Sequence, residues 1–207
     1  MSERVAPELM VKEEWVTLYG YERAFHKQSW VRGCHPDDAV LNPEGVPERF
    51  KTPVRNLSLV LGLKPNPEAF VLGYLQTYPA DVAADVLKQL DRREGFDPSR
   101  PSEELAYLRG PCRVVDEEGT SREALTYFTN PASEKVDDSL SIESQAAILA
   151  AATSAEGNGS KARGLFYLEG VRAALRTAGH HDQILEALSG CAYKWYVGRL
   201  HLLSPEG

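Results

Sequence analysis

The pattern that most constrains the fold lies in residues 78–96, which read YPADVAADVLKQLDRREGF. Apolar residues recur there every three or four positions, as on one side of an α-helix, and the stripe consists of Val82, Ala83, Val86, Leu87 and Leu90. Asp81 is placed to cap the first turn, and Gly95 is placed to end the last one. We therefore predict an amphipathic helix that packs its apolar side against the rest of the chain.

Glu94 lies four residues after Leu90, so it continues the apolar stripe instead of joining the solvated side of the helix. Partial burial and the negative end of the helix dipole favour the protonated carboxyl, whereas Arg92 and Arg93 favour the carboxylate. A glutamate under these opposing influences can serve as a general acid and base. The same spacing also fits a solvated glutamate in a last helical turn, with Asp91 and Arg92 on the solvated face.

The composition is that of a soluble globular chain. Its 207 residues suit a single domain, with a core at 12–130 and helices at 139–198. The net charge of −7 gives no attraction to phosphate backbones or anionic lipid, so we expect neither a nucleic-acid nor a membrane partner. No apolar run approaches the roughly 20 residues that cross a bilayer, and the first residues lack the pattern of a secretion signal.

Three cysteines, Cys34, Cys112 and Cys191, are odd in number and far apart. This argues against a disulfide framework and for a reducing, cytoplasmic location. Cys34-His35 has no second ligand cluster at metal-site spacing, so no metal site is expected. His180-His181 fits an exposed turn between helices.

Strands are predicted on both sides of the 78–96 helix. Alternation and aromatics indicate a strand at 15–27, followed by a long irregular loop at 32–53. Residues 54–63 and 68–77 fit two strands of an antiparallel hairpin, with Lys64-Pro65-Asn66-Pro67 as its turn. Gly73, inside the second of them, suggests a bulge or a close backbone approach. After the helix, strands at 105–115 and 122–129 flank a turn at 117–120.

The last third of the sequence is helical. Helices are predicted at 142–152, 160–177 and 182–197, with breaks at 156–159 and at Ala178-Gly179, and a frayed tail at 200–207. Strands around one helix, followed by further helices, predict an α+β fold: a small, mostly antiparallel barrel or curved sheet with helices packed outside it.

The segment VLGYLQTYPADVAADVLKQLDRREGF resembles the signature of γ-glutamyl cyclotransferases, especially the ChaC-like branch that acts on glutathione. In that family a G-x-(A/L)-Y strand precedes a helix that ends in L-D-x-R-E-x-G-[YF], and the positions here are Gly73-Tyr74-Leu75 and 90–96. Weaker similarities lie on both sides of this segment, in the order in which the family has them: at 20–25 before it, and at 124–128 and from 159 to 188 after it.

The resemblance implies a γ-glutamyl cyclotransferase-like barrel with surrounding helices and a helical C-terminal part. It also implies a cofactor-free and metal-free enzyme that converts a small γ-glutamyl compound, such as glutathione, to 5-oxoproline. Glu94 corresponds to the family's catalytic acid and base, and Tyr74, Tyr127 and Tyr107 are candidates for lining the substrate cavity. A strand tyrosine with its ring in the core and its hydroxyl at the rim is the other interpretation.

One departure concerns the Y-G-S-[LN] loop, whose backbone N–H groups hold the γ-glutamyl part of the substrate in the family. Only nineteen residues precede Gly20 in this sequence, and none reads Y-G-S. The loop is lost, it is replaced, or Tyr19-Gly20-Tyr21 serves in its place in a different register, which makes Tyr19 and Gly20 candidate substrate contacts. A second departure lies at 138–141, where cyclotransferases outside the ChaC branch often carry a tyrosine that contacts the substrate. This sequence has no tyrosine there.

Two further interpretations stay open at the level of sequence. The chain could be a catalytically inactive member of this family that acts as a binding or regulatory protein, an alternative that the departure from the Y-G-S loop favours. It could also be an unrelated α+β domain. Both a monomer and a homodimer are compatible with the sequence.

Overall fold

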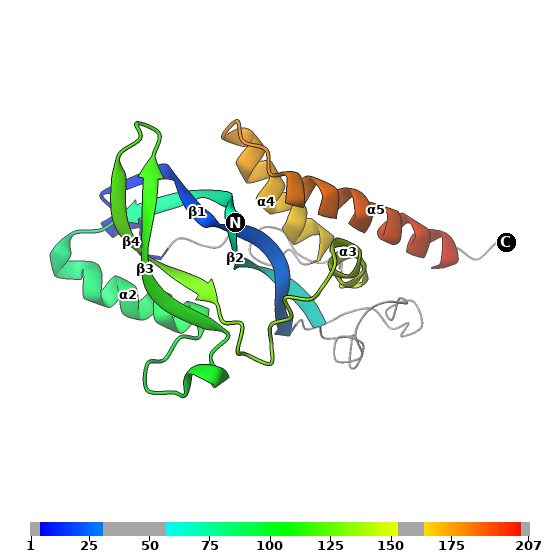
Figure 1. Cartoon of the computed structure of the whole chain (residues 1–207), viewed down its shortest axis with the longest axis horizontal. Coiled ribbons are helices and arrows are strands. Elements are labelled where there is room, and N and C mark those ends of the chain that lie inside the picture. The colour runs from blue at the N-terminus through cyan, green and yellow to red at the C-terminus, as the bar shows by residue number, and fades with distance from the viewer. Residues whose placement is uncertain (1–4, 31–56, 153–163, 204–207) are drawn as a thin grey trace. The chain divides into compact units, whose positions relative to one another are not determined.

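The computed structural model describes residues 5–30, 57–152 and 164–203 (Figure 1). The chain divides into two compact units. The sheet unit combines Glu3–Ala24 with Gly62–Asp138, and the helical unit combines Phe25–Leu61 with Ser139–Gly207. The expectation of a single domain stays a prediction. The predicted loop at 32–53, Cys34-His35 and the break at 156–159 lie outside the described residues.

The predicted α+β class is confirmed in the described part of the chain, which contains one four-stranded sheet and four α-helices. The strands are β1 (Lys12–Trp30), β2 (Leu57–Thr77), β3 (Tyr107–Asp116) and β4 (Ser121–Thr129). They lie in the order β2-β1-β3-β4, and β3 is antiparallel to both of its neighbours. Because β2 and β4 do not pair within these residues, the sheet is not closed and the predicted barrel is not confirmed.

The hairpin predicted at 54–77 is wrong: the structure has one continuous strand, β2, through Lys64-Pro65-Asn66-Pro67. Proline cannot donate to a sheet ladder, but among the described residues β2 is an edge strand of the sheet. The Asn66 side chain stabilises this stretch, since its Oδ1 accepts from the Glu68 N–H at 3.1 Å and its Nδ2 donates to Glu22 at 2.7 Å.

Gly20 marks a change of alternation within β1. Before it, Val16 and Leu18 face the core of the sheet unit, and after it Tyr21 packs against the same core. The φ angle of Gly20 is 82°, a left-handed conformation that glycine adopts readily and that accommodates an extra residue in a strand. Tyr19-Gly20-Tyr21 therefore lies inside β1, so it does not form a loop in the described structure.

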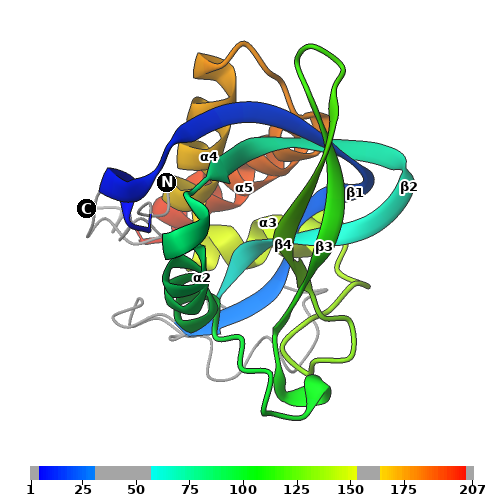
Figure 2. The same ribbon diagram turned by 90° about the vertical axis from the view of Figure 1, so that its left-hand side faces the viewer.

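The hairpin of β3 and β4 agrees with its prediction to within two residues at each end. Its strands run side by side in Figure 2, joined by the turn at 117–120. Arg109 lies opposite Tyr127 in the register, and Cys112 lies opposite Ala124. Alternation then sends these two pairs to opposite faces of the hairpin. Cys112 and Ala124 contact the core of the sheet unit, which is built from Val16, Leu18, Val71 and Val114.

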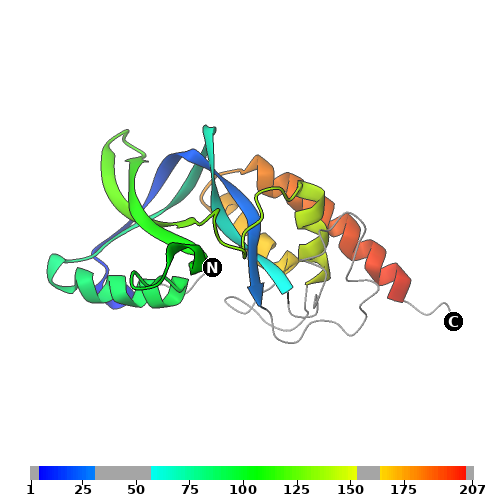
Figure 3. The ribbon, with the colours of Figure 1, turned by 60° about the horizontal axis from the view of Figure 1, so that its bottom comes forward.

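The predicted amphipathic helix is α2 (Ala80–Glu94), which lies alongside the β3–β4 hairpin (Figure 3). Val86 is buried, whereas Ala83 is exposed. Asp81 does not cap the helix as predicted, because the N-cap position is Pro79. Asp81 lies in the first turn instead, where its negative charge interacts favourably with the positive end of the helix dipole. Gly95 ends the helix as predicted, with φ 70°.

The helical unit contains α3 (Ile142–Ala151), α4 (Leu165–Thr177) and α5 (Gln183–Leu203), of which α4 and α5 lie side by side. Ser141 caps α3 through the Ser144 N–H at 3.1 Å. The interior of this unit is apolar and includes Ile148, Leu149, Leu165, Leu168, Leu185 and Leu188. α5 continues to Leu203, so the tail predicted from residue 200 is wrong for 200–203, and residues 204–207 lie outside the described residues.

Candidate active site

Glu94 is the last residue of α2 and lies on its half-buried side. Val86 is buried, Leu90 is half-buried and the Glu94 side chain is 24% exposed, whereas Arg92 and Arg93 are exposed. The prediction that Glu94 continues the apolar stripe is therefore confirmed. Its Oε1 accepts a hydrogen bond from Nε of Arg93 at 2.8 Å. The Glu94 side chain is thus partly shielded from bulk water, and within the described residues its carboxylate pairs with Arg93.

A tight turn after Glu94 fixes its backbone. The Gly95 N–H donates to the Arg92 carbonyl at 3.4 Å, and the Phe96 N–H donates to the Asp91 carbonyl at 2.9 Å. This is the Schellman arrangement, in which a left-handed glycine reverses the chain and satisfies the last carbonyls of the helix. The sequence R-E-G-F therefore holds Glu94 at a defined exit from the helix.

Asp91, predicted to lie on the solvated face of α2, is half-buried and bonded to the β3–β4 hairpin. Its side chain is 16% exposed. Its Oδ1 accepts from the Tyr127 hydroxyl at 2.7 Å, and its Oδ2 accepts from an Arg109 Nη at 2.5 Å. Both partners come from the hairpin face opposite to the core of the sheet unit, and they are cross-strand neighbours. The prediction was wrong because these partners are supplied by strands distant in sequence.

Phe96 completes this group, which we call the Asp91 cluster: Asp91, Phe96, Arg109 and Tyr127. The guanidinium carbon of Arg109 lies 5.0 Å from the centroid of the Phe96 ring, within the range of a cation–π contact. The same ring meets Tyr127 edge-on, with centroids 6.4 Å apart. Burial, followed by the negative charge and hydrogen bond of Asp91, raises the pKa of Tyr127 far above its ordinary value.

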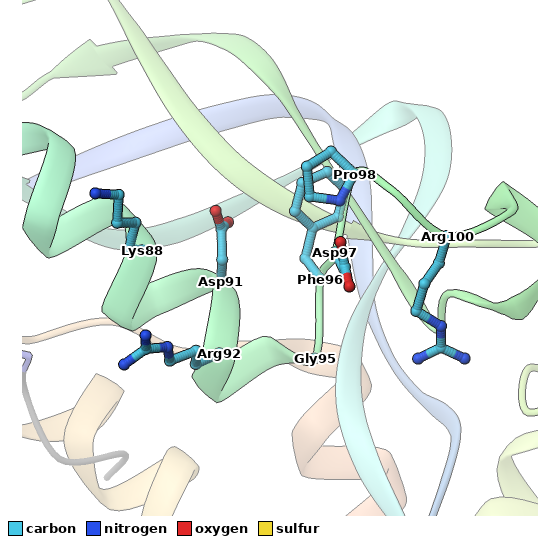
Figure 4. Close-up of a pocket in the computed structure, with 8 residues that line it drawn as sticks. All are labelled: Lys88, Asp91, Arg92, Gly95, Phe96, Asp97, Pro98 and Arg100. Atoms are coloured by element: carbon cyan, nitrogen blue, oxygen red, sulfur yellow. The ribbon is translucent and has the colours of Figure 1, made fainter.

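A cavity of about 400 Å³ opens beside the end of α2 (Figure 4). Its wall is formed by Lys88, Asp91, Arg92, Gly95, Phe96, Asp97, Pro98 and Arg100. Three of these residues are cationic and two are anionic. Glu94 is not in this wall, because helical spacing turns it away from the side of Lys88 and Arg92 and towards the side of Leu90.

A second hollow, of about 210 Å³, lies in the sheet unit against its apolar core. Its lining includes Val16, Leu18, Val71, Gly73, Tyr74, Cys112 and Val114, together with Arg23. The Arg23 guanidinium donates to the Leu72 carbonyl, and burial raises the pKa of Cys112. No described atom would crowd a Cβ at Gly73, so the close backbone approach suggested there is absent among the described residues.

The structure places the other predicted site residues in different surroundings. Tyr107 is buried on the same hairpin face as Tyr127. Tyr74 is 46% exposed and packs on Trp15, with ring centroids 4.0 Å apart. Tyr19 is 61% exposed and lies 6.0 Å from the Phe70 ring, next to Gly20 in β1. Within the described residues, none of them hydrogen-bonds to Glu94, so their assignment as substrate contacts stays a prediction.

Arg109 and Phe96 are the residues of this region that the sequence reasoning did not single out. The predicted turn at 117–120 contained the signal for Arg109. If Asp116 and Thr120 close that turn, counting back along both strands sets Arg109 opposite Tyr127, as observed. The signal for Phe96 is its place directly after a helix-ending glycine, a position that often packs against the last turn.

Within the described ranges, no group of three or more histidine, cysteine, aspartate or glutamate side chains is arranged to hold a metal ion. No helix in those ranges is long and apolar enough to span a membrane.

Comparisons with known proteins give a clear result at the level of fold. No family model and no curated protein matches the sequence. Two crystal structures of a γ-glutamyl cyclotransferase specific to glutathione from yeast are similar to the structure. The selenomethionine-labelled one has a TM-score of 0.66 at 14% identity and covers 92% of this chain and 91% of its own. The other has a TM-score of 0.61 at 14% identity and covers 92% and 93%. The resemblance stated from the sequence is therefore confirmed for the fold.

Proposed function

We propose that this protein is a γ-glutamyl cyclotransferase that converts glutathione or another γ-glutamyl compound to 5-oxoproline and a free amine. The observation that carries the proposal is the position of Glu94. A half-buried carboxylate ends α2, its backbone is fixed by the Gly95 turn, and the chain has the fold of the yeast enzyme.

In the proposed reaction, Glu94 takes a proton from the α-ammonium group of the substrate. The freed amine nitrogen attacks the substrate's own γ-carbonyl carbon and closes a five-membered ring. The bond between that carbon and the distal nitrogen then breaks, and Glu94 returns its proton to the departing nitrogen. The ring nitrogen gives up its second proton, so that the products are the neutral lactam and the protonated amine. Nucleophile and electrophile belong to one molecule, so binding the substrate in a folded conformation supplies much of the rate.

The experiment incubates the purified protein with glutathione and a panel of γ-glutamyl amino acids and follows 5-oxoproline by mass spectrometry. An N-acetylated γ-glutamyl compound is the matched control, because its blocked nitrogen cannot attack the carbonyl. We expect release from at least one free-amine substrate and none from the blocked one. Release of product from the blocked compound would exclude cyclisation. If no compound of the panel released 5-oxoproline, the proposed activity would be excluded.

A second candidate function is binding of a γ-glutamyl compound without turnover. It is favoured by the place of Tyr19-Gly20-Tyr21 inside β1, where these residues form a strand and not a substrate loop. Within the described residues, no backbone N–H donates to the Glu94 carboxylate. Saturable binding of glutathione by calorimetry, together with silence on the panel, would support this alternative.

A further inference from the structure

The Asp91 cluster ties the end of α2 to the β3–β4 hairpin at two points, one on each side of Glu94. Asp91 binds Tyr127 and Arg109 through its side chain, and Phe96 packs its ring against the same two residues. We infer that Asp91 is a positioning residue that, with Tyr127 and Arg109, fixes where the Glu94 carboxylate lies. This inference rests on the proposed function of Glu94.

Asp91 is unsuited to be the base itself. Each of its carboxylate oxygens already accepts a hydrogen bond, one from the Tyr127 hydroxyl and one from the Arg109 guanidinium. Bonds between charged partners are about twice as strong as neutral ones, so a substrate ammonium group would have to compete with the Arg109 guanidinium for the Asp91 carboxylate. Glu94 has one side-chain partner within the described residues, namely Arg93, and retains free acceptor capacity.

The connection from Asp91 to Glu94 runs through a short stretch of backbone. The carbonyl of Asp91 accepts the Phe96 N–H, which closes the turn around Glu94. The two ends of this turn are therefore held by one hydrogen bond between them and by side-chain contacts to the hairpin. If the Asp91 side chain no longer binds Tyr127 and Arg109, the glycine turn remains but loses these hydrogen bonds to β3 and β4.

This inference also gives Tyr127 a different role from the one implied by the family resemblance. Its hydroxyl proton is committed to Asp91 at 2.7 Å, and its ring is engaged with Phe96. The raised pKa of Tyr127 keeps it protonated, so it serves as a permanent donor to Asp91. It would then act on turnover by holding α2 and not by contacting the substrate.

The kinetic test compares Asp91→Asn and Tyr127→Phe with the wild type, alone and in a Glu94→Gln background. Asp85→Asn is the matched control, since Asp85 is an exposed aspartate of the same helix that pairs only with Lys88 within the described residues. We expect Asp91→Asn to lower kcat by about 10- to 100-fold with KM nearly unchanged, the size of effect that a small misplacement of a reacting group causes. Tyr127→Phe should have a smaller effect in the same direction.

In the Glu94→Gln background, Asp91→Asn should cause no further loss, because a positioning residue acts only through the group that it positions. A further loss of the same size would overturn the inference, as would a rise in KM with kcat unchanged, which would make Asp91 a substrate contact. A fall in kcat for Asp85→Asn equal to that for Asp91→Asn would also overturn it.

A readout that does not need turnover separates this inference from the proposed function. Hydrogen exchange of the Phe96 amide reports the turn directly, since that N–H is bonded to the Asp91 carbonyl. We expect exchange at least about tenfold faster in Asp91→Asn than in the wild type and unchanged in Asp85→Asn. Equal rates in all three proteins would overturn the positioning role. If wild type releases no 5-oxoproline, the proposed function fails, and exchange alone decides whether Asp91 holds the turn.

Discussion

The Tyr127 hydroxyl lies 2.7 Å from Oδ1 of Asp91 and so joins β4 to α2 across 36 positions of sequence. The bond is charge-assisted and partly shielded from water, and Arg109 balances the carboxylate from the other side. It forms the side-chain link between the helix that ends in Glu94 and the strand that supplies Tyr127. The predictions below concern this helix end and this hairpin.

Tyr127→Phe should lower the free energy of unfolding by about 1–2 kcal/mol at neutral pH, because it leaves a charged acceptor without one of its donors. The sign of the pH dependence follows from the raised pKa of Tyr127. A raised pKa contributes stability that is fully present below the ordinary value of 10.0 and is lost as the pH rises through the folded value. Urea unfolding of both proteins at a series of pH values measures this difference.

We expect the difference in free energy of unfolding between wild type and Tyr127→Phe to be constant below about pH 10 and to shrink above it. Tyr193→Phe, which removes a hydroxyl from an exposed tyrosine of α5, controls for the general cost of the substitution. A gap that widens at alkaline pH would contradict the hydrogen bond from Tyr127 to Asp91.

Gly95→Ala should destabilise the protein by about 1 kcal/mol, since the φ of 70° places the residue in the left-handed region where a Cβ is strained. Gly170→Ala is the matched control inside α4, where no described atom would crowd the new methyl group. That control should be neutral or stabilising by up to about 1 kcal/mol, because alanine is the better helix former. Thermal unfolding of both variants tests the contrast, and equal effects would contradict the Gly95 turn.

Asp116→Asn should lower the melting temperature by about 2–4 °C at pH 7. The Asp116 carboxylate closes the β3–β4 turn by accepting from the Thr120 N–H at 2.8 Å and from the Glu118 N–H at 3.1 Å, and it also pairs with Arg122. The Thr120 N–H bond is the main cause that holds the pKa of Asp116 below its ordinary value of 3.8.

A lowered pKa contributes stability that is present above the ordinary value and is lost as the pH falls through the folded value. The difference in melting temperature between Asp116→Asn and wild type should therefore disappear at pH values below about 3.8. Glu117→Gln, in the same turn, is the control and should match wild type. A gap that persists undiminished in acid would contradict the role assigned to the ionised Asp116.

The parts of the fold that local patterns determine were predicted well. The helix at 80–94 follows from the spacing of its apolar residues, and its end follows from the one glycine that can take a left-handed φ there. The β3–β4 hairpin follows from alternation and from a polar turn between its strands. Each of these signals lies within about 20 residues of sequence.

The errors arose where a neighbour in space overrides the local pattern. Lys64-Pro65-Asn66-Pro67 has the composition of a turn, yet it continues β2, which is an edge strand in the described part of the sheet and so tolerates proline. Asp91 is a charged residue at a helix position for which the local pattern predicts solvent exposure. It nevertheless hydrogen-bonds to Arg109 and Tyr127 of the hairpin. No periodicity within α2 predicts those contacts.

Predicting the position of the proposed acid and base was easier than predicting its surroundings. Glu94 could be singled out because burial on a helix follows a period, and the resemblance to a known signature added its chemistry. Tyr74, Tyr19 and Gly20 were named by position in a motif, and the structure gives them aromatic or strand surroundings instead of a contact with Glu94. Which strands surround a carboxylate depends on the sheet order, which a single sequence does not specify.

The central claim is that Glu94 carries the proton in the cyclisation. The most direct measurement is the initial rate of 5-oxoproline release by wild type, Glu94→Gln and Glu118→Gln, the last being the same change in an exposed turn. We predict that Glu94→Gln lowers kcat by a factor of about 100 to 10,000 while Glu118→Gln retains the wild-type rate. A wild-type rate in Glu94→Gln would contradict the account.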